Sequence, residues 1–519
     1  MNKGIRPARH VRAFVAAGAV VSLFGSLAGG SVAQAAPNGK SLNVLENVNF
    51  EGSWPGLDPA TNTNDAADLN MMNAVYGGLF ELGANNQVIP DLAKGYKFTN
   101  GGKTLTINLR PGVKFTDGTP LNAQAVAFNI KRDLEPQYGC ICDSSFPVKS
   151  ITPQGQLDVV IQLKEVFAPI ISAFSGSAPN WIISPTALSK MGEKAFALKP
   201  VGAGPFEVVS DKPSAVLQLQ ANPTYWQKGK PLLRNLTFTA VGSDQSAVEG
   251  IEAGDAGAYQ DLTTVPLVAA AKKSLQVTTI PAALGPYVVQ LNTTAAPFNN
   301  IKAREALYYA TDPQPINKGL VDGLGTISQS PSGPGALFYF PTVPGYRTYN
   351  LAKAKALVAQ LGGGLKVNLI TSSAGIGVQI ATALKSQWSQ AGIDATISAD
   401  ELPALVSAFH SFNFQAALQS AGGYDTAIGN GMALRYASSA PFTGVKDPKL
   451  DKLINEGVSV LSPAKRRPIY RQIATYISDH AYSPFLFNVP SWNVAAKNVS
   501  GPGLTTSNFF VRWEDVTVK

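Results

Sequence analysis

The alternation of apolar and polar side chains predicts a strand over residues 105–109, because its three aliphatic side chains share one face. Pro111 and Gly112 follow and break the strand. A short helix is expected after this turn, with Asn122 at its N-cap and an apolar face that includes Val126 and Ile130. This part of the chain therefore combines strand and helix.

The stretch from 350 to 397 gives the clearest view of fold class. Apolar residues at helical spacing predict two helices, one capped by Asn350 and ended by Gly362, the other closed by Gly392. Strands are predicted over 365–370 and 393–397. This β-α-β-α-β-like order is typical of an α/β lobe.

The C-terminal region begins with Ser462 and Pro463, which together predict a helix start. The buried face of this helix is expected to carry isoleucines spaced by four, at positions 469, 473 and 477. A strand-like segment at 485–489 follows, and we expect it to return to the first lobe. Two crossings between lobes would then act as a hinge, because few dihedral angles must change for closure.

The N-terminus predicts an export signal. Four basic residues, at positions 3, 6, 9 and 12, precede an uncharged apolar stretch that extends to about residue 28, and the small residues 31–36 supply cleavage positions. We therefore assign 1–36 to a signal peptide, although a retained anchor is the alternative. Because the only cysteines are Cys140 and Cys142, a lipid-attached form is disfavoured and a free periplasmic protein is expected.

The length and net charge of the chain limit the range of possible folds and functions. A chain of 519 residues is too long for one core, so two or three lobes and a cleft are expected. The composition, 45% hydrophobic and 15% charged, is globular. Removing the first 36 residues takes away four positive and no negative charges, which lowers the formal net charge from +8 to +4. This charge is too weak to indicate a nucleic-acid partner.

One long motif resembles a known family. Residues 105–126, LTINLRPGVKFTDGTPLNAQAV, look like the signature of the family 5 extracellular solute-binding proteins, the dipeptide and oligopeptide receptors of bacterial ABC importers. Further blocks resemble the same family in the same order, at 57–59, 73–79, 201–206 with 222–226, 303–312 and 465–476. The resemblance therefore spans the chain that follows the signal.

Membership implies an α/β, two-lobed periplasmic binding protein (Venus-flytrap) with an additional subdomain inserted in the first lobe. The expected divisions are 37–80, 201–292 and 486–519 for lobe I, 81–200 for the inserted subdomain, and 293–485 for lobe II. A peptide or peptide-sized solute would be enclosed between the lobes of a monomer, then delivered to separate permease and ATPase subunits. The resemblance implies no enzyme activity and no cofactor.

The resemblance also points to residues that contact solute. Peptide-binding relatives place an Asp after a Gly-Trp-type segment, where it pairs with the ligand's ammonium group, and the nearest match here is Tyr424 followed by Asp425. A turn residue is the alternative for Asp425. Arg435 is a candidate clamp for a carboxylate, and an exposed surface arginine is the competing interpretation.

Three further candidates are polar or aromatic residues at expected cleft positions. Trp54 lies on a predicted loop after the first strand, where it would stack on solute or anchor the loop by packing. Tyr287 and Asn292 lie near the expected crossing and carry the same two interpretations. Cys140 and Cys142 are compatible with a strained local disulfide or with two free thiols, and no metal site is expected.

Other functions remain open at this stage. A secreted hydrolase is one, although the chain has no Gly-x-Ser-x-Gly or His-Glu-x-x-His motif, and Ser462 with Lys465 fits a helix start better than a nucleophile. The same fold also binds oligosaccharides, opine-like conjugates and metal chelates, or reports occupancy to a sensor. Fold alone does not settle the solute.

Overall fold

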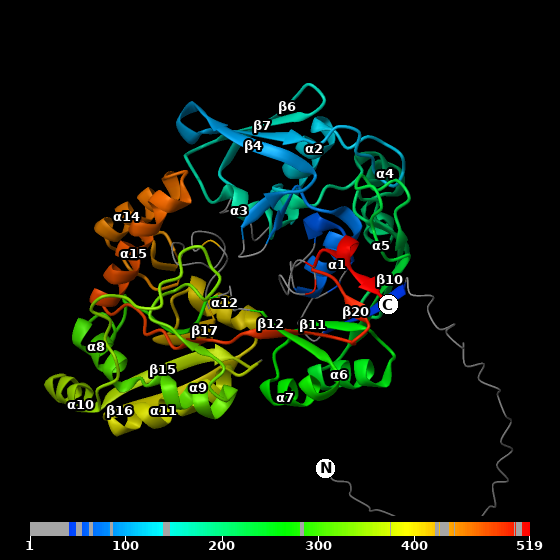
Figure 1. Ribbon diagram of the computed structural model, residues 1–519. Helices are drawn as coiled ribbons and strands as arrows, with labels where there is room; N and C mark the ends of the chain where they lie inside the picture. The colour runs from blue at the N-terminus through cyan, green and yellow to red at the C-terminus, as the bar shows by residue number, and fades with distance from the viewer. Residues whose placement is uncertain are drawn as a thin grey trace, which may run out of the picture. The chain divides into compact units, whose positions relative to one another are not determined.

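The computed structural model describes residues 41–47, 54, 56–61, 66–83, 87–138, 146–280, 285–373, 375–420, 425, 435–440, 442–502, 504 and 511–519. These residues form two α/β lobes with a further small sheet, as predicted (Figure 1). Residues 39–519 make one compact unit, distinct from the first 38 residues.

The first lobe is built on a seven-stranded mixed sheet. β1 pairs in parallel with β10 and β11, and the remaining neighbours are antiparallel. The strands, in spatial order, are β12 (Gln276–Ile280), β19 (Ser491–Ala495), β11 (Ala258–Leu262), β1 (Ser41–Asn47), β10 (Asn235–Val241), β9 (Val216–Ala221) and β8 (Phe206–Lys212). The helices of this lobe are α1 (Ala66–Tyr76), α6 (Asp244–Ala253) and α7 (Val265–Ser274).

A second, four-stranded sheet carries the inserted subdomain. The predicted strand at 105–109 is confirmed as β5 (Thr104–Leu109), with its aliphatic side chains buried, and Asn122 caps α2 by accepting from the Ala125 N–H at 3.0 Å. The strands, in spatial order, are β4 (Ala93–Thr99), β5, β7 (Asp158–Leu163) and β6 (Val148–Gln154). Its helices are α2 (Ala123–Asp133), α3 (Ile170–Phe174), α4 (Pro185–Met191) and α5 (Glu193–Leu198), and β2 (Phe80–Leu82) and β3 (Val88–Pro90) form a ribbon beside the sheet.

The second lobe has its own four-stranded sheet, in the order β13 (Tyr287–Leu291), β17 (Ala416–Ser420), β15 (Leu365–Ser372) and β16 (Ile393–Asp400). The predicted β-α-β order is confirmed by α10 (Leu351–Gln360), β15, α11 (Gly377–Gln390) and β16. Because β13 belongs to this sheet, the second lobe begins before the expected boundary at residue 293. Its other helices are α8 (Ile301–Ala310), α9 (Pro313–Val321), α12 (Leu402–His410), α14 (Pro448–Ser459) and α15 (Pro463–Asp479).

One continuous hydrophobic core lies against the same side of the two large sheets. It includes Tyr259 of the first lobe together with Val289 and Leu291 of the second. Figure 1 shows α6 and α7 below the first sheet and α9 and α11 below the second, whereas α12 lies on the opposite side. The two lobes therefore each present one face to a shared core and another face away from it.

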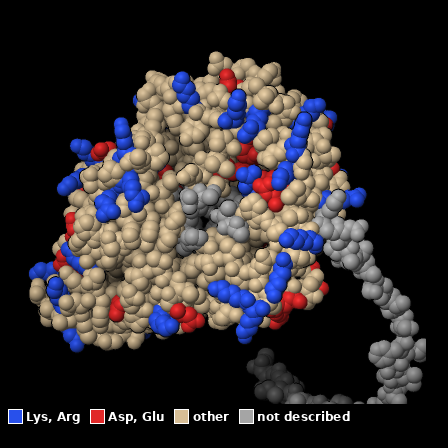
Figure 2. All heavy atoms as spheres, in the orientation of Figure 1, with Lys and Arg blue, Asp and Glu red and all other residues tan. Residues whose placement is uncertain are grey.

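The charged side chains on the face drawn in Figure 2 are spread over the surface, with Lys and Arg interspersed with Asp and Glu. They do not gather into one basic patch on this face, which agrees with the weak net charge of the chain. None of the helices in the described part of the chain combines the length and the apolar character needed to cross a bilayer.

Candidate functional site

The chain passes between the two large sheets through neighbouring segments. Residues 281–286 lead from β12 to β13, and residues 489–490 lead from β18 (Phe487–Asn488) to β19. On the second-lobe side, β13 pairs with the residues that precede β18, because the Val289 N–H donates to the Pro484 carbonyl at 3.0 Å and the Leu486 N–H to the Tyr287 carbonyl at 2.8 Å. Two crossings of this kind are suitable as a hinge.

The strand predicted over 485–489 does not itself return to the first lobe. Phe487 and Asn488 form β18, which pairs with β14 (Thr326–Ile327) in a two-stranded ribbon. The return is made by the next strand, β19, which lies between β11 and β12 in the first sheet. The sequence pattern was correct for a strand but placed the return one strand too early.

Tyr287 and Asn292 lie at the two ends of β13. The ring of Tyr287 is half-buried against Phe487, with centroids 6.0 Å apart, and burial raises the pKa of its hydroxyl. The Asn292 side chain is fully buried and its amide donates to the carbonyls of Phe412 and Phe414, at 3.0 and 2.8 Å. These bonds hold the loop before β17, which is a structural role.

Asp425 forms a buried bidentate ion pair. Its two carboxylate oxygens accept from the guanidinium of Arg466 on α15, at 2.7 and 2.8 Å, and both side chains are buried. The Arg466 Nε donates to the Gly457 carbonyl at 2.9 Å, and the guanidinium lies over the ring of Phe338. A solute ammonium group would therefore have to compete with a guanidinium that is already in place.

Arg435 reaches the same end of the β13–β17 pair as Tyr287. Its Nη2 lies 3.4 Å from the Ser420 carbonyl, and Ser420 is the residue that opposes Tyr287 in the sheet. The side chain is 1% exposed, and burial lowers the pKa of the guanidinium to about 10. Arg435 is therefore a buried cation at neutral pH, and the interpretation as an exposed surface arginine is wrong.

Trp54 is part of the core of the first lobe. Its indole has no exposed surface, and the Nε1 donates to the Asp211 carboxylate at 3.0 Å. Burial is the larger influence on the pKa of Asp211 and raises it to about 6, although this hydrogen bond lowers it. The geometry favours the packing role over a stacking role. Tyr424, Cys140 and Cys142 lie outside the described residues.

Two buried glutamines were missed by sequence reasoning. Gln260 on β11 is 2% exposed, and neither its Nε2 nor its Oε1 has a hydrogen-bond partner among the described residues. Gln290 on β13 is fully buried; its Oε1 accepts from Gln419, and its Nε2 has no partner in that same part of the chain. For Gln290 the available signal was a polar residue inside the otherwise apolar strand YVVQL, whereas Gln260 is followed by Asp261 and carries no such signal.

Within the described part of the chain, no three side chains of His, Cys, Asp or Glu cluster so as to hold a metal ion. The arrangement around the crossing offers one buried cation, several amides and paired strand edges. These groups suit the binding of a polar solute.

Comparison with known proteins gives consistent results. The family model for bacterial extracellular solute-binding proteins, family 5 Middle, matches residues 87–442. A curated relative, the glutathione-binding protein GsiB of Salmonella typhi, is 31% identical over 353 residues, which cover 66% of this chain and 67% of the relative.

Two solved structures share the fold. The ABC transporter substrate-binding protein CtaP of Listeria monocytogenes superposes with a TM-score of 0.80 at 20% identity, over 93% of this chain and 100% of its own. The oligopeptide-binding protein AppA of Bacillus subtilis, in complex with a nonapeptide, has a TM-score of 0.74 at 22% identity, over 93% of this chain and 99% of its own.

Proposed function

The chain belongs to family 5 of the bacterial extracellular solute-binding proteins, and we propose that it captures a short peptide between its two lobes for an ABC importer. The single observation that carries this proposal beyond the family is that the chain crosses twice between the two large sheets, from β12 to β13 and from β18 to β19. It permits closure by a change in few backbone dihedral angles.

A peptide is favoured as the solute for two reasons. The relative from Salmonella is named for glutathione, a short peptide, and the AppA structure holds a nonapeptide. In addition, the described residues near the crossing include side-chain amides, those of Gln290 and Gln419, which can hydrogen-bond a peptide main chain. An oligosaccharide or an opine-like conjugate is the alternative solute for this fold.

We place the solute near the end of the β13–β17 pair where Tyr287 opposes Ser420 and the Arg435 guanidinium lies 3.4 Å from the Ser420 carbonyl. A guanidinium there would attract a solute carboxylate, and bidentate geometry would add specificity. Closure of the lobes removes water from such a contact and strengthens it.

The solute is handed on unchanged in this proposal. Members of the family act as binding receptors rather than enzymes, and the only hydrolase-like spacing in the sequence has a structural explanation. Ser462 precedes the first turn of α15, with Pro463 at the first helical position, and its carbonyl accepts from the Lys465 N–H at 3.0 Å.

The proposal includes the export of the chain and its membrane partners. Residues 1–36 would direct secretion to the periplasm, where the mature monomer delivers its solute to a permease and an ATPase in the inner membrane. Reporting of occupancy to a sensor would use the same closure.

The test is calorimetric titration of the purified mature chain with glutathione and with di- and tripeptides. We expect one solute per chain, a smaller radius of gyration on binding, and recovery of the intact solute by mass spectrometry. Steady formation of product, or an unchanged scattering profile with every solute that binds, would overturn the proposal.

A further inference from the structure

Gln260 and Gln290 lie on the faces of the two large sheets that turn away from the shared core. Successive side chains of a strand point to opposite faces. Tyr259 and Leu262, which flank Gln260 across a register shift in β11, both belong to the shared core, as do Val289 and Leu291 on either side of Gln290. Both glutamine side chains therefore point to the side opposite the helices α6, α7, α9 and α11 that Figure 1 shows below the sheets.

Each glutamine also lies close to the crossing. β11 pairs with β19, the strand that begins directly after the returning segment 489–490. β13 is the first strand after the outgoing segment 281–286. One glutamine therefore belongs to each lobe, and each is on a strand that enters or borders the hinge.

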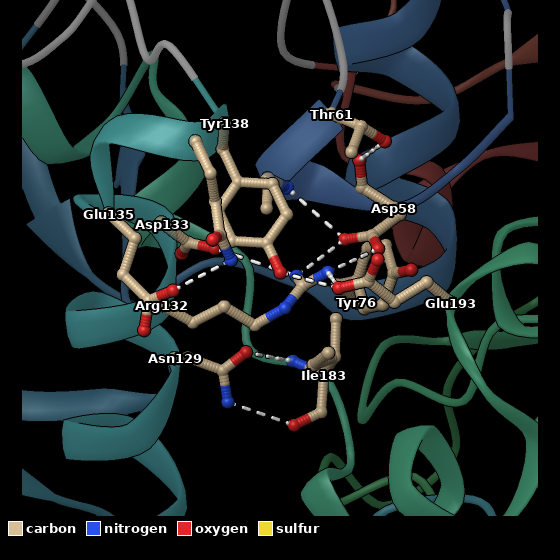
Figure 3. A network of polar contacts seen from close by, with 12 residues as sticks. Asp58, Thr61, Tyr76, Asn129, Arg132, Asp133, Glu135, Tyr138, Ile183 and Glu193 are labelled. Atoms are coloured by element: carbon tan, nitrogen blue, oxygen red, sulfur yellow. Dashed lines mark hydrogen bonds and ion pairs between the residues drawn. The ribbon is translucent and has the colours of Figure 1, made fainter.

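Gln260 and Gln290 carry buried polar atoms that have no hydrogen-bond partner among the described residues, which is energetically unfavourable. A buried donor or acceptor without a partner loses its hydration and gains nothing in exchange, so buried amides are normally bonded. Asn129 shows the usual pattern: its amide donates to the Ala125 carbonyl at 2.8 Å. It also donates to the Ile183 carbonyl and accepts from the Ile183 N–H, both at 3.0 Å (Figure 3). Gln260 and Gln290 depart from this pattern at equal burial.

We propose that Gln260 and Gln290 hydrogen-bond amide groups of the solute, one from each lobe. The open Nε2 and Oε1 of Gln260 match the carbonyl and the N–H of a peptide unit. Gln290, whose Oε1 is taken by Gln419, offers a donor for a second carbonyl or a carboxylate. The inference rests on the proposed function and names its solute class as amide-containing.

The proposal predicts opposite effects on binding and on stability. Gln260→Met keeps the volume of the side chain and removes its open polar atoms, so the solute-free protein should melt at the same temperature or higher. The same change should weaken the binding of glutathione, or of whichever short peptide the wild type binds, by about tenfold for each hydrogen bond lost. A purely structural glutamine would give a lower melting temperature instead.

Two further variants complete the test. Gln290→Met should also weaken binding about tenfold, since its open donor is lost. Asn129→Leu is the matched control, because it removes a buried amide whose bonds are made within the protein; it should lower the melting temperature and leave affinity unchanged. Melting is followed by calorimetry and affinity by titration with the same peptide.

The outcomes separate this inference from the proposed function. If the wild type binds none of the peptides, the proposed function fails and this inference fails with it. If the wild type binds and both methionine variants bind as tightly, the inference alone is overturned. A lower melting temperature for Gln260→Met in the absence of solute also overturns it, because the glutamine would then be structural.

Discussion

Asp58 and Arg132 form a buried bidentate ion pair that joins the first lobe to its inserted subdomain (Figure 3). The carboxylate precedes α1, the guanidinium lies near the end of α2, and the two N–O distances are 2.6 and 2.7 Å. Glu193 of α5 adds a third contact at 3.3 Å, with a side chain that is 57% exposed. Asp58, Arg132 and Glu193 together therefore connect three segments that are distant in sequence.

Arg132→Met should destabilise the protein strongly, because it leaves the buried carboxylate of Asp58 without its cation. Breaking a buried pair in this way typically costs about 3–5 kcal/mol. Glu193→Gln, at the exposed end of the same network, should cost less than about 1 kcal/mol. Urea unfolding of both variants measures the difference, and equal losses would mean that the burial of the pair does not matter.

A cluster of buried carboxylates should make stability depend on pH. Arg512 contacts Glu514 at 3.0 Å, Asp515 at 3.3 Å and Glu81 at 3.6 Å. Asp91 lies beside this cluster, where burial and then the charge of Glu514 raise the pKa of its carboxyl to about 7. Burial also raises the pKa values of Glu81 and Glu514. Lys230 also pairs with Asp515, at 2.5 Å, and burial still raises the pKa values of the other three carboxyls.

The sign follows from proton binding. Between its unfolded pKa, about 4, and its folded pKa, Asp91 holds a proton in the native state that the unfolded chain has released. Protonation of Asp91 therefore favours the folded state at low pH. This contribution to the free energy of unfolding is lost as the pH rises to about 7, and it no longer changes above that pH. Asp91→Asn should flatten this part of the profile and raise stability at pH 8. The measurement is urea unfolding at pH 5 and pH 8. If the stability of Asp91→Asn depends on pH as that of the wild type does, Asp91 is not the group responsible.

Asp425 is expected to hold Arg466 rather than a solute ammonium group. Since both carboxylate oxygens are bonded to the guanidinium, a peptide with an acetylated amino end should bind within a few-fold of the free peptide. Asp425→Asn should instead lower stability by about 3–5 kcal/mol, because Arg466 is left buried without its partner. The measurement is titration with the free and the acetylated peptide. A large loss of affinity on acetylation would show that Asp425 does pair with the ammonium group of the solute.

The sequence predicted those features that depend on neighbouring residues. Asn122 and Asn350 were expected to cap helices, and each accepts from a backbone N–H three residues later at 3.0 Å. The isoleucine stripe of α15, at positions 469, 473 and 477, is buried as its spacing indicated. Helix caps and the spacing of apolar residues depend on residues that are near in sequence, so both can be recognised in a single sequence.

Contacts between distant residues were not predictable in the same way. The partner of Asp425 lies 41 residues away on α15, and no local pattern marks it. Trp54 has a left-handed backbone conformation, with φ at 55°, and its indole bonds to Asp211, 157 residues later. The sequence indicated the loop that carries Trp54, but the direction of the side chain depends on tertiary packing.

A small contact between the inserted subdomain and the second lobe should slow solute release. The Ala168 N–H donates to the Val458 carbonyl at 2.7 Å, and Val458 packs against the cores on both sides. One hydrogen bond with a few apolar contacts is worth about 1–2 kcal/mol. Because the contact joins the inserted subdomain to the second lobe, we expect opening of the lobes to break it, so that it favours the closed state.

Val458→Asp places a charge in this apolar contact and should raise the rate of solute dissociation by roughly tenfold, with a smaller effect on association. Leu198→Asp is the control, because Leu198 is a comparably apolar side chain, 45% exposed, at the end of α5. Stopped-flow displacement of a bound peptide measures both rates. If Val458→Asp releases the solute at the wild-type rate, the contact plays no part in closure.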